Sequence, residues 1–256
     1  MNKVLYFIAS VAVLASAFAC KPDDKDKIDD QTGTKTRIAQ LCDQWDWWDF
    51  VYDANGKIEK VDRGNGDRVW NFAWTGNNCA VTGRDEFTFT LGANGMISTL
   101  NFKGVYTYTY DADGHMTEAK KDGAVVSTIT ITDGNITKVV EGENTFVFTY
   151  TANDNVNGIQ MHYQDRLNAM LPSWYRFMIE SGLMGKASAK IPATLTVNGT
   201  KVCDYSVETR RATEAEMKDN AGISNEKDYV FLSGKEMKSD GSLTDAFHCY
   251  TFEEYK

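Results

Sequence analysis

Histidine is scarce in this chain of 256 residues, which has only His115, His162 and His248. None of them lies in a His-Glu-x-x-His motif or at ligand spacing from a cysteine, so no zinc site is predicted. The sequence also lacks a Cys-x-x-Cys pair and a Gly-x-Ser-x-Gly elbow, the usual marks of a redox site and of a serine hydrolase. Because no catalytic constellation is visible, we expect a protein that is not an enzyme and uses neither metal nor cofactor. An envelope hydrolase is the less favoured alternative.

A calcium loop is also missing. Residues 111–114 (Asp-Ala-Asp-Gly) and 153–155 (Asn-Asp-Asn) carry oxygen ligands, but the third ligand before the glycine and the closing glutamate of an EF-hand are absent. Aspartate and asparagine in such segments hydrogen-bond their own backbone. We therefore interpret these residues as turns.

Basic residues are outnumbered by acidic ones. Without Lys3, which lies in the apolar N-terminal segment described next, the chain keeps 26 basic and 36 acidic residues and a net charge of −10. An acidic surface repels phosphate backbones, which excludes nucleic acid as an expected partner. It also argues against electrostatic docking on anionic lipid.

Long apolar runs are absent except at residues 4–19, and these sixteen residues are shorter than the roughly 20 that a transmembrane helix needs. Lys3 precedes the run, and small residues end it immediately before Cys20. This order predicts a signal peptide over residues 1–19 and a bacterial lipoprotein with its lipid on Cys20. The charged residues up to 40 predict a disordered leash. We expect a lipid-anchored outer-membrane protein facing the cell surface; secretion without lipid is the alternative.

Four further cysteines, Cys42, Cys79, Cys203 and Cys249, remain after Cys20. An oxidising envelope permits disulfides among them, and four cysteines allow three pairings that the sequence does not distinguish. Four buried free thiols are an equally good interpretation, because a free cysteine packs as a small apolar residue.

Turn signals recur through the first half of the chain. Asn-Gly, Asp-Gly and related turns lie near positions 56, 76, 95, 114, 134 and 154, about twenty residues apart, and a second set of turns lies between them. These residues tolerate the positive φ angles of tight hairpins. A turn about every ten residues predicts consecutive antiparallel strands.

The segments between the turns alternate aromatic residues with threonine or other small residues, as in residues 70–74, 87–91, 106–110 and 146–150. A period of two places the aromatics on one face of a sheet. We predict about twelve strands between Trp47 and Tyr163, in an up-and-down antiparallel meander that curls into a barrel or half-barrel. The predicted strands have six or seven residues, fewer than the 9–11 of a membrane barrel, which favours a sheet in water.

Past Tyr163 the period changes to that of amphipathic helices. Leu167, Met170 and Leu171 form one stripe and Trp174, Phe177 and Met178 another, with Pro172 between them. We predict two short helices within residues 164–190, packing on one end of the sheet. Closing strands are predicted over residues 191–256, with a polar, helix-leaning excursion at 211–226. Residues 41–256 then form a single β-rich domain, and residues 41–163 are its repeat meander.

Two features together resemble a known family. The Tyr-Asp-Ala-Asn-Gly and Tyr-Asp-Ala-Asp-Gly repeats at 52–56 and 110–114, and the segment 182–188 leading to Ile191-Pro192, are similar to a family of Bacteroidetes lipoproteins of unknown function. The acidic residues after Cys20 resemble the export signal of surface lipoproteins from these bacteria. The resemblance implies a porin-like β fold and an envelope location. It implies no site residues.

The cluster Trp45, Trp47 and Trp48 is the one segment with the character of a binding site. In a strand Trp45 and Trp47 face one side and Trp48 the other, so we expect at least one of them to lie outside the core. Tryptophan is enriched at binding hot spots, although all-β domains also bury it. We expect a surface binding module for a glycan, peptide or protein partner. The alternative is a structural or assembly lipoprotein without a small ligand.

Overall fold

A computed structural model describes residues 35–43, 46–64, 66, 68–160, 176–238 and 240–255. The predicted signal peptide, Cys20 and Trp45 lie outside these residues. The first eleven strands are β1 (Lys35–Asp43), β2 (Trp47–Tyr52), β3 (Ile58–Arg63), β4 (Arg68–Thr75), β5 (Asn78–Gly83), β6 (Phe87–Leu91), β7 (Ile97–Asn101), β8 (Val105–Tyr110), β9 (Met116–Lys121), β10 (Ala124–Thr132) and β11 (Asn135–Glu141). They are followed by β12 (Asn144–Asp154), α1 (Arg176–Glu180), β13 (Lys190–Val197), β14 (Thr200–Asp204), β15 (Ser206–Arg211), α2 (Glu214–Asp219), β16 (Asp228–Met237) and β17 (Leu243–Tyr255).

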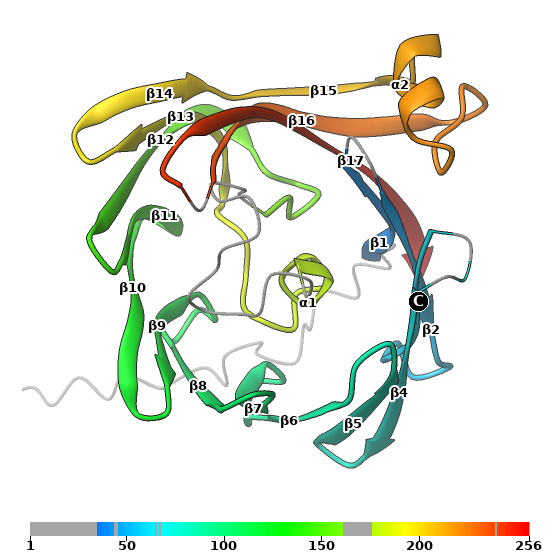
Figure 1. The fold of residues 1–256 in the computed structure, drawn as a ribbon, viewed down its shortest axis with the longest axis vertical. Coiled ribbons are helices and arrows are strands. Elements are labelled where there is room, and N and C mark those ends of the chain that lie inside the picture. Colours follow the sequence, from blue (N-terminus) through cyan, green and yellow to red (C-terminus); the bar gives the residue numbers. More distant parts are fainter. Residues whose placement is uncertain are drawn as a thin grey trace, which may run out of the picture. The chain divides into compact units, whose positions relative to one another are not determined.

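The strands form one antiparallel meander that curls into a nearly closed barrel, as predicted (Figure 1). Each strand from β1 to β13 pairs with the next, β15 pairs with β16, and β16 pairs with β17. The last strand returns to the first: Cys42 of β1 lies opposite Cys249 of β17. Between β14 and β15 the chain bends at Tyr205, whose amide still bonds the Ala193 carbonyl at 2.9 Å.

The sheet begins earlier than expected. β1 starts at Lys35, so the last six residues of the predicted leash belong to the barrel. Ile38 joins the core, and Arg37 pairs with Glu253 of β17 at 2.6 Å. This partnership, 216 residues away in sequence, explains why a segment with a polar composition is ordered.

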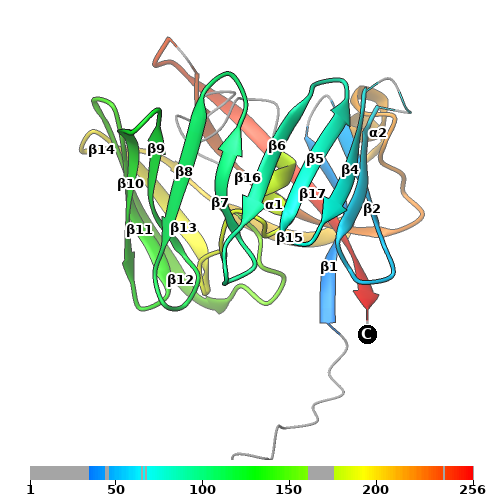
Figure 2. The same ribbon diagram turned by 90° about the horizontal axis from the view of Figure 1, so that it is seen from below.

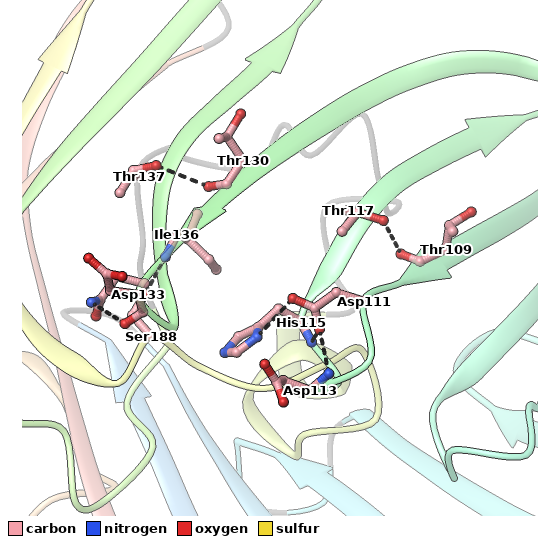
Figure 3. Close-up of polar contacts among 11 residues, drawn as sticks. Thr109, Asp111, Asp113, His115, Thr117, Thr130, Asp133, Ile136, Thr137 and Ser188 are labelled. Atoms are coloured by element: carbon pink, nitrogen blue, oxygen red, sulfur yellow. Dashed lines mark hydrogen bonds and ion pairs between the residues drawn. The ribbon is translucent and has the colours of Figure 1, made fainter. Parts of the chain in front are cut away.

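The aspartates of the repeats build the turns, as predicted. In the turn between β8 and β9, Oδ1 of Asp111 accepts hydrogen bonds from the amides of Asp113 at 3.0 Å and His115 at 2.8 Å (Figure 3). The Asp111 Oδ2 lies 3.2 Å from the His115 ring. Both carboxylate oxygens are thus engaged within the turn. Among the described residues, no group of three histidine, cysteine or acidic side chains is placed to hold a metal.

The tyrosines of the repeats tie neighbouring strands together. The hydroxyl of Tyr52 donates to the carbonyl of Ile38 at 2.8 Å, and that of Tyr110 donates to the carbonyl of Ile97 at 2.7 Å. Tyr150 bonds the Ile136 carbonyl in the same way. Each acceptor lies 13 or 14 residues earlier in the chain. The Tyr-Asp pair therefore combines a strand-to-strand hydrogen bond with a turn-forming carboxylate.

Replacing Tyr110 with phenylalanine should lower the free energy of unfolding by about 1 kcal/mol, because a half-buried carbonyl loses its donor. Urea unfolding followed by tryptophan fluorescence measures the change. Tyr106→Phe is the matched control, since Tyr106 is a buried tyrosine on the same strand whose hydroxyl makes no hydrogen bond within the described part of the chain. Equal losses in the two variants would contradict the role of the tyrosine hydrogen bond.

Aromatic residues fill the interior and α1 lies among them. The ring centroids of Phe177 and Trp70 are 5.0 Å apart, and those of Phe177 and Phe72 are 6.1 Å apart. Both views place α1 within the ring of strands rather than over one end as a lid (Figures 1 and 2). The first predicted helix lies outside the described residues.

The outer face of the barrel is polar. Its exposed positions include a set of threonines, namely Thr88, Thr107, Thr109, Thr128, Thr130 and Thr149. A transmembrane barrel has the opposite arrangement, with apolar residues outside and polar ones within. Strand length does not make the same distinction, because β10 and β12 have 9 and 11 residues rather than the six or seven predicted.

Neither of the two described helices has the length and apolar character needed to cross a membrane. The second, α2, belongs to the predicted excursion and begins at a capping box formed by Thr213 and Glu216. The Asn220 amide then bonds the carbonyls of Asp43 at 2.7 Å and Asp46 at 2.8 Å. These contacts fix the excursion on the outer side of β1 and β2.

Candidate functional site

Trp47 and Trp48, the described residues of the predicted tryptophan segment, point to opposite faces of the barrel wall. Trp48 is 5% exposed and belongs to the interior core, with the Arg63 guanidinium 5.0 Å from its ring centroid. Trp47 points outward beneath the excursion, where a Cβ on Gly222 would lie 2.1 Å from its ring. Gly222 thus covers one face of Trp47. Trp48 presents no surface to a ligand, and ligand binding here stays a prediction that depends on the partly exposed Trp47.

Residues 181–189, named here the rim segment, run across one end of the barrel. The Leu183 carbonyl accepts from the Ile97 amide at 2.8 Å, and the Lys186 amide donates to Gly114 at 2.9 Å. The Ser188 hydroxyl accepts from the Ile136 amide at 3.0 Å (Figure 3). The rim segment therefore fastens to the turns that recur about every twenty residues, and it contains residues 182–188 of the family resemblance.

A cleft of about 450 Å³ opens beside the rim segment. We name it the rim cleft. It lies between the start of β1, the loop after β12, the end of α1, the rim segment and the end of β17. Its lining combines aromatic rings with polar and charged groups, among them Arg37, Gln160, Glu180, Lys186, Tyr250, Phe252 and Tyr255.

Arg37 is held in the wall of the rim cleft by three contacts. Its Nε lies 2.6 Å from the Glu253 carboxylate. Its guanidinium carbon lies 3.9 Å from the Tyr52 ring centroid and 5.0 Å from that of Tyr255. Stacking and ion pairing together restrict a side chain that is otherwise flexible. The cleft thus has a fixed cation beside an aromatic ring.

A buried charged network, formed by Arg176, Glu236 and His248, lies on the interior side of β16 and β17. His248 Nε2 lies 2.8 Å from Glu236 Oε1, and Arg176 Nη2 lies 3.2 Å from the same oxygen. Glu236 and His248 are 4% and 3% exposed. Glu236 of β16 and His248 of β17 point into the barrel, where they meet Arg176 of α1. The network therefore joins α1 to the barrel wall.

Glu180 connects this network to the rim cleft. Burial raises the pKa of its carboxyl from the ordinary 4.5 to about 7, while the positive charges of His248 and Arg176 oppose the shift. The side chain is 9% exposed and lines the cleft. At neutral pH a substantial fraction of Glu180 is therefore protonated and able to donate a hydrogen bond.

The Glu180 shift predicts a pH dependence of stability. Between pH 4.5 and about 7 the unfolded chain releases the proton while the folded chain keeps it, so the free energy of unfolding falls as pH rises through this window. The loss attributable to Glu180 is at most about 3 kcal/mol. Urea unfolding at pH 4.5 and 7.5 should show a smaller loss in Glu180→Gln than in wild type. Identical pH profiles would contradict the assignment.

All four described cysteines are buried free thiols in this structure. Cys42 and Cys249 face each other across β1 and β17. Cys79 and Cys203 lie on β5 and β14 and have no cysteine opposite them in the sheet.

The rim cleft and the charged network were not anticipated from the sequence. A signal was present, because Glu236 and His248 occupy core positions in strands rich in apolar residues. A charged residue at such a position rarely lies there without a partner. The sequence alone does not identify Arg176 as the partner, because Arg176 reaches these residues only through the position of α1 inside the barrel.

No protein-family model and no curated protein matches this sequence. Among solved structures, a porin-like protein from Bacteroides uniformis is similar to it, with a TM-score of 0.55 and 13% sequence identity over 84% of this chain and 98% of that chain. This likeness supports the porin-like β fold. A Tc holotoxin pore from Photorhabdus luminescens matches with a TM-score of 0.22 and 10% identity over 74% of this chain and 11% of that chain, and carries no argument.

Proposed function

We propose that the protein is a lipid-anchored binding module of the outer membrane that takes a glycan in the rim cleft. The observation that carries the proposal is the convergence of aromatic rings, amides and charged groups on one cleft of about 450 Å³. Ligand sites have this composition: apolar walls with a few placed polar groups. The lipoprotein signal predicted at Cys20 supplies the location.

The chemistry of the lining favours a polyhydroxylated ligand. The partly exposed rings of Phe252 and Tyr255 offer flat apolar faces of the kind that sugar C–H groups contact. Arg37 and Lys186 donate hydrogen bonds, and Gln160 both donates and accepts. A protonated Glu180 adds a further donor at neutral pH.

An envelope hydrolase is the second candidate, because Glu180 is a carboxyl group with a raised pKa in a cleft. A glycosidase needs two carboxyl groups on either side of the scissile bond. Glu236, the nearby acid, is 4% exposed, bonded to His248 and Arg176, and absent from the cleft lining. Binding without hydrolysis therefore fits the site better.

An oligosaccharide array, followed by calorimetry on the best binder, tests the proposal. We expect Lys186→Ala combined with Tyr255→Ala to weaken binding by at least about tenfold, which corresponds to about 1.4 kcal/mol. Trp47→Ala is the matched control at the other candidate position and should bind as wild type does. Binding lost in Trp47→Ala but kept in the double variant would move the site to the tryptophan segment. Release of free sugar from the bound oligosaccharide would favour the hydrolase.

A further inference from the structure

Two cysteines meet at the seam where the barrel closes. β1 and β17 are the first and last strands, and their pairing completes the ring. Within this ladder Cys42 and Cys249 are direct cross-strand partners. Each is 0% exposed, in a small outer core with Tyr229 and Phe231 beneath the excursion. The Cys42 thiol donates a hydrogen bond to Gln40 Oε1 at 3.7 Å.

We propose that Cys42 and Cys249 form a disulfide that closes the barrel covalently between its first and last strands. Directly opposed residues of an antiparallel pair have Cβ atoms about 4.5–5.5 Å apart, so a small adjustment reaches the spacing of a disulfide. The thiols in the structure then represent the reduced form. The proposal requires an oxidising compartment, as the lipoprotein signal predicts, but it does not require the rim cleft to bind a ligand.

The reaction is thiol–disulfide exchange with an external disulfide as oxidant, either a low-molecular-weight disulfide or the disulfide form of an envelope oxidoreductase. One thiol loses its proton and attacks the oxidant, forming a mixed disulfide and releasing one oxidant thiolate. The second thiolate then displaces the other half of the oxidant. Two protons leave the cysteines, and two electrons reduce the oxidant to two thiols.

The surroundings of the pair indicate when the bond forms. Burial raises the pKa of the Cys42 thiol, and the outer core also includes Ala212 and Ile223 from the excursion. A buried neutral thiol is a poor nucleophile. Oxidation should therefore occur during folding, before the excursion packs over β1 and β17, and the folded reduced protein should react slowly.

The other cysteines supply internal controls. Cys79 lies opposite Trp74 on one side and Phe89 on the other, and Cys203 lies opposite Leu195. Neither faces a second thiol in the ladders that the structure describes. We therefore expect both to remain reduced under conditions that link Cys42 to Cys249.

Refolding of the full chain in a buffer of reduced and oxidised glutathione tests the proposal. The products are denatured, alkylated, digested without reduction and mapped by mass spectrometry. A peptide pair linking Cys42 to Cys249, with Cys79 and Cys203 alkylated, is the expected result. Alkylation of both Cys42 and Cys249, or a link between any other two cysteines, would overturn it.

A thermal measurement adds a second readout. Reduction of the refolded wild type should lower the midpoint of thermal unfolding by about 5–15 °C, since the disulfide closes a loop of about 200 residues. The paired variant Cys42→Ser with Cys249→Ser should show no such dependence on reductant, while Cys79→Ser should behave as wild type. A wild-type midpoint that does not change on reduction would count against the disulfide.

Discussion

Replacing Glu236 with glutamine should lower the free energy of unfolding by about 3–5 kcal/mol, the cost of breaking a buried ion pair by removing one partner. The carboxylate is 4% exposed and bonds both His248 at 2.8 Å and Arg176 at 3.2 Å. Glutamine keeps the shape of the side chain but removes the carboxylate charge that lies 3.2 Å from Arg176. Urea unfolding followed by tryptophan fluorescence gives the midpoint and slope that measure the loss.

Asp245→Asn is the matched control for this prediction. Asp245 and Lys235 form an ion pair at 3.5 Å on the same two strands, but the Asp245 side chain is 90% exposed. Exposed pairs contribute little, so the change should stay below about 1 kcal/mol. A loss in Glu236→Gln as small as in Asp245→Asn would show that the network does not hold α1 to the barrel wall.

Replacing Phe177 with alanine should also destabilise the protein by about 3–5 kcal/mol. The ring is 0% exposed and packs against Trp70 and Phe72 inside the barrel. Its removal leaves a cavity between α1 and β4, and closely packed strands cannot close around it. The same unfolding experiment measures the loss.

Val147→Thr serves as the control for Phe177→Ala, because Val147 is 37% exposed on the outer face of β12. A change within about 0.5 kcal/mol is expected there. If Phe177→Ala were as mild, the packing of α1 inside the barrel would be wrong. A loss of ligand binding with preserved stability would instead assign Phe177 to the site.

The meander could be predicted because its signals are local. Turns at Asp53, Asp111 and Asp133 and the alternation in segments such as 106–110 concern neighbouring residues, and each specifies a strand or a hairpin without reference to the rest of the chain. Short connections then leave little choice of topology. About twelve strands were predicted between Trp47 and Tyr163, and the described part of this stretch contains the eleven strands β2 to β12.

The contents of the barrel could not be predicted in the same way. The stripe with Phe177 and Met178 indicates a helix that buries one face, but a lid and an interior helix bury the same residues. The charged network depends on bringing Arg176 within reach of Glu236, 60 residues away. Lys35 to Gln40 were assigned to the leash because their partners on β17 lie at the far end of the chain.

Hydrogen–deuterium exchange with the best oligosaccharide from the array tests the proposed binding site most directly. Binding in the rim cleft predicts slower exchange in residues 155–160 and 181–189, which line it, and unchanged exchange in residues 212–226, which cover Trp47. Protection confined to 212–226, or none at any oligosaccharide concentration that saturates calorimetric binding, would contradict the proposed site. Failure of every oligosaccharide on the array to bind would contradict the proposed function.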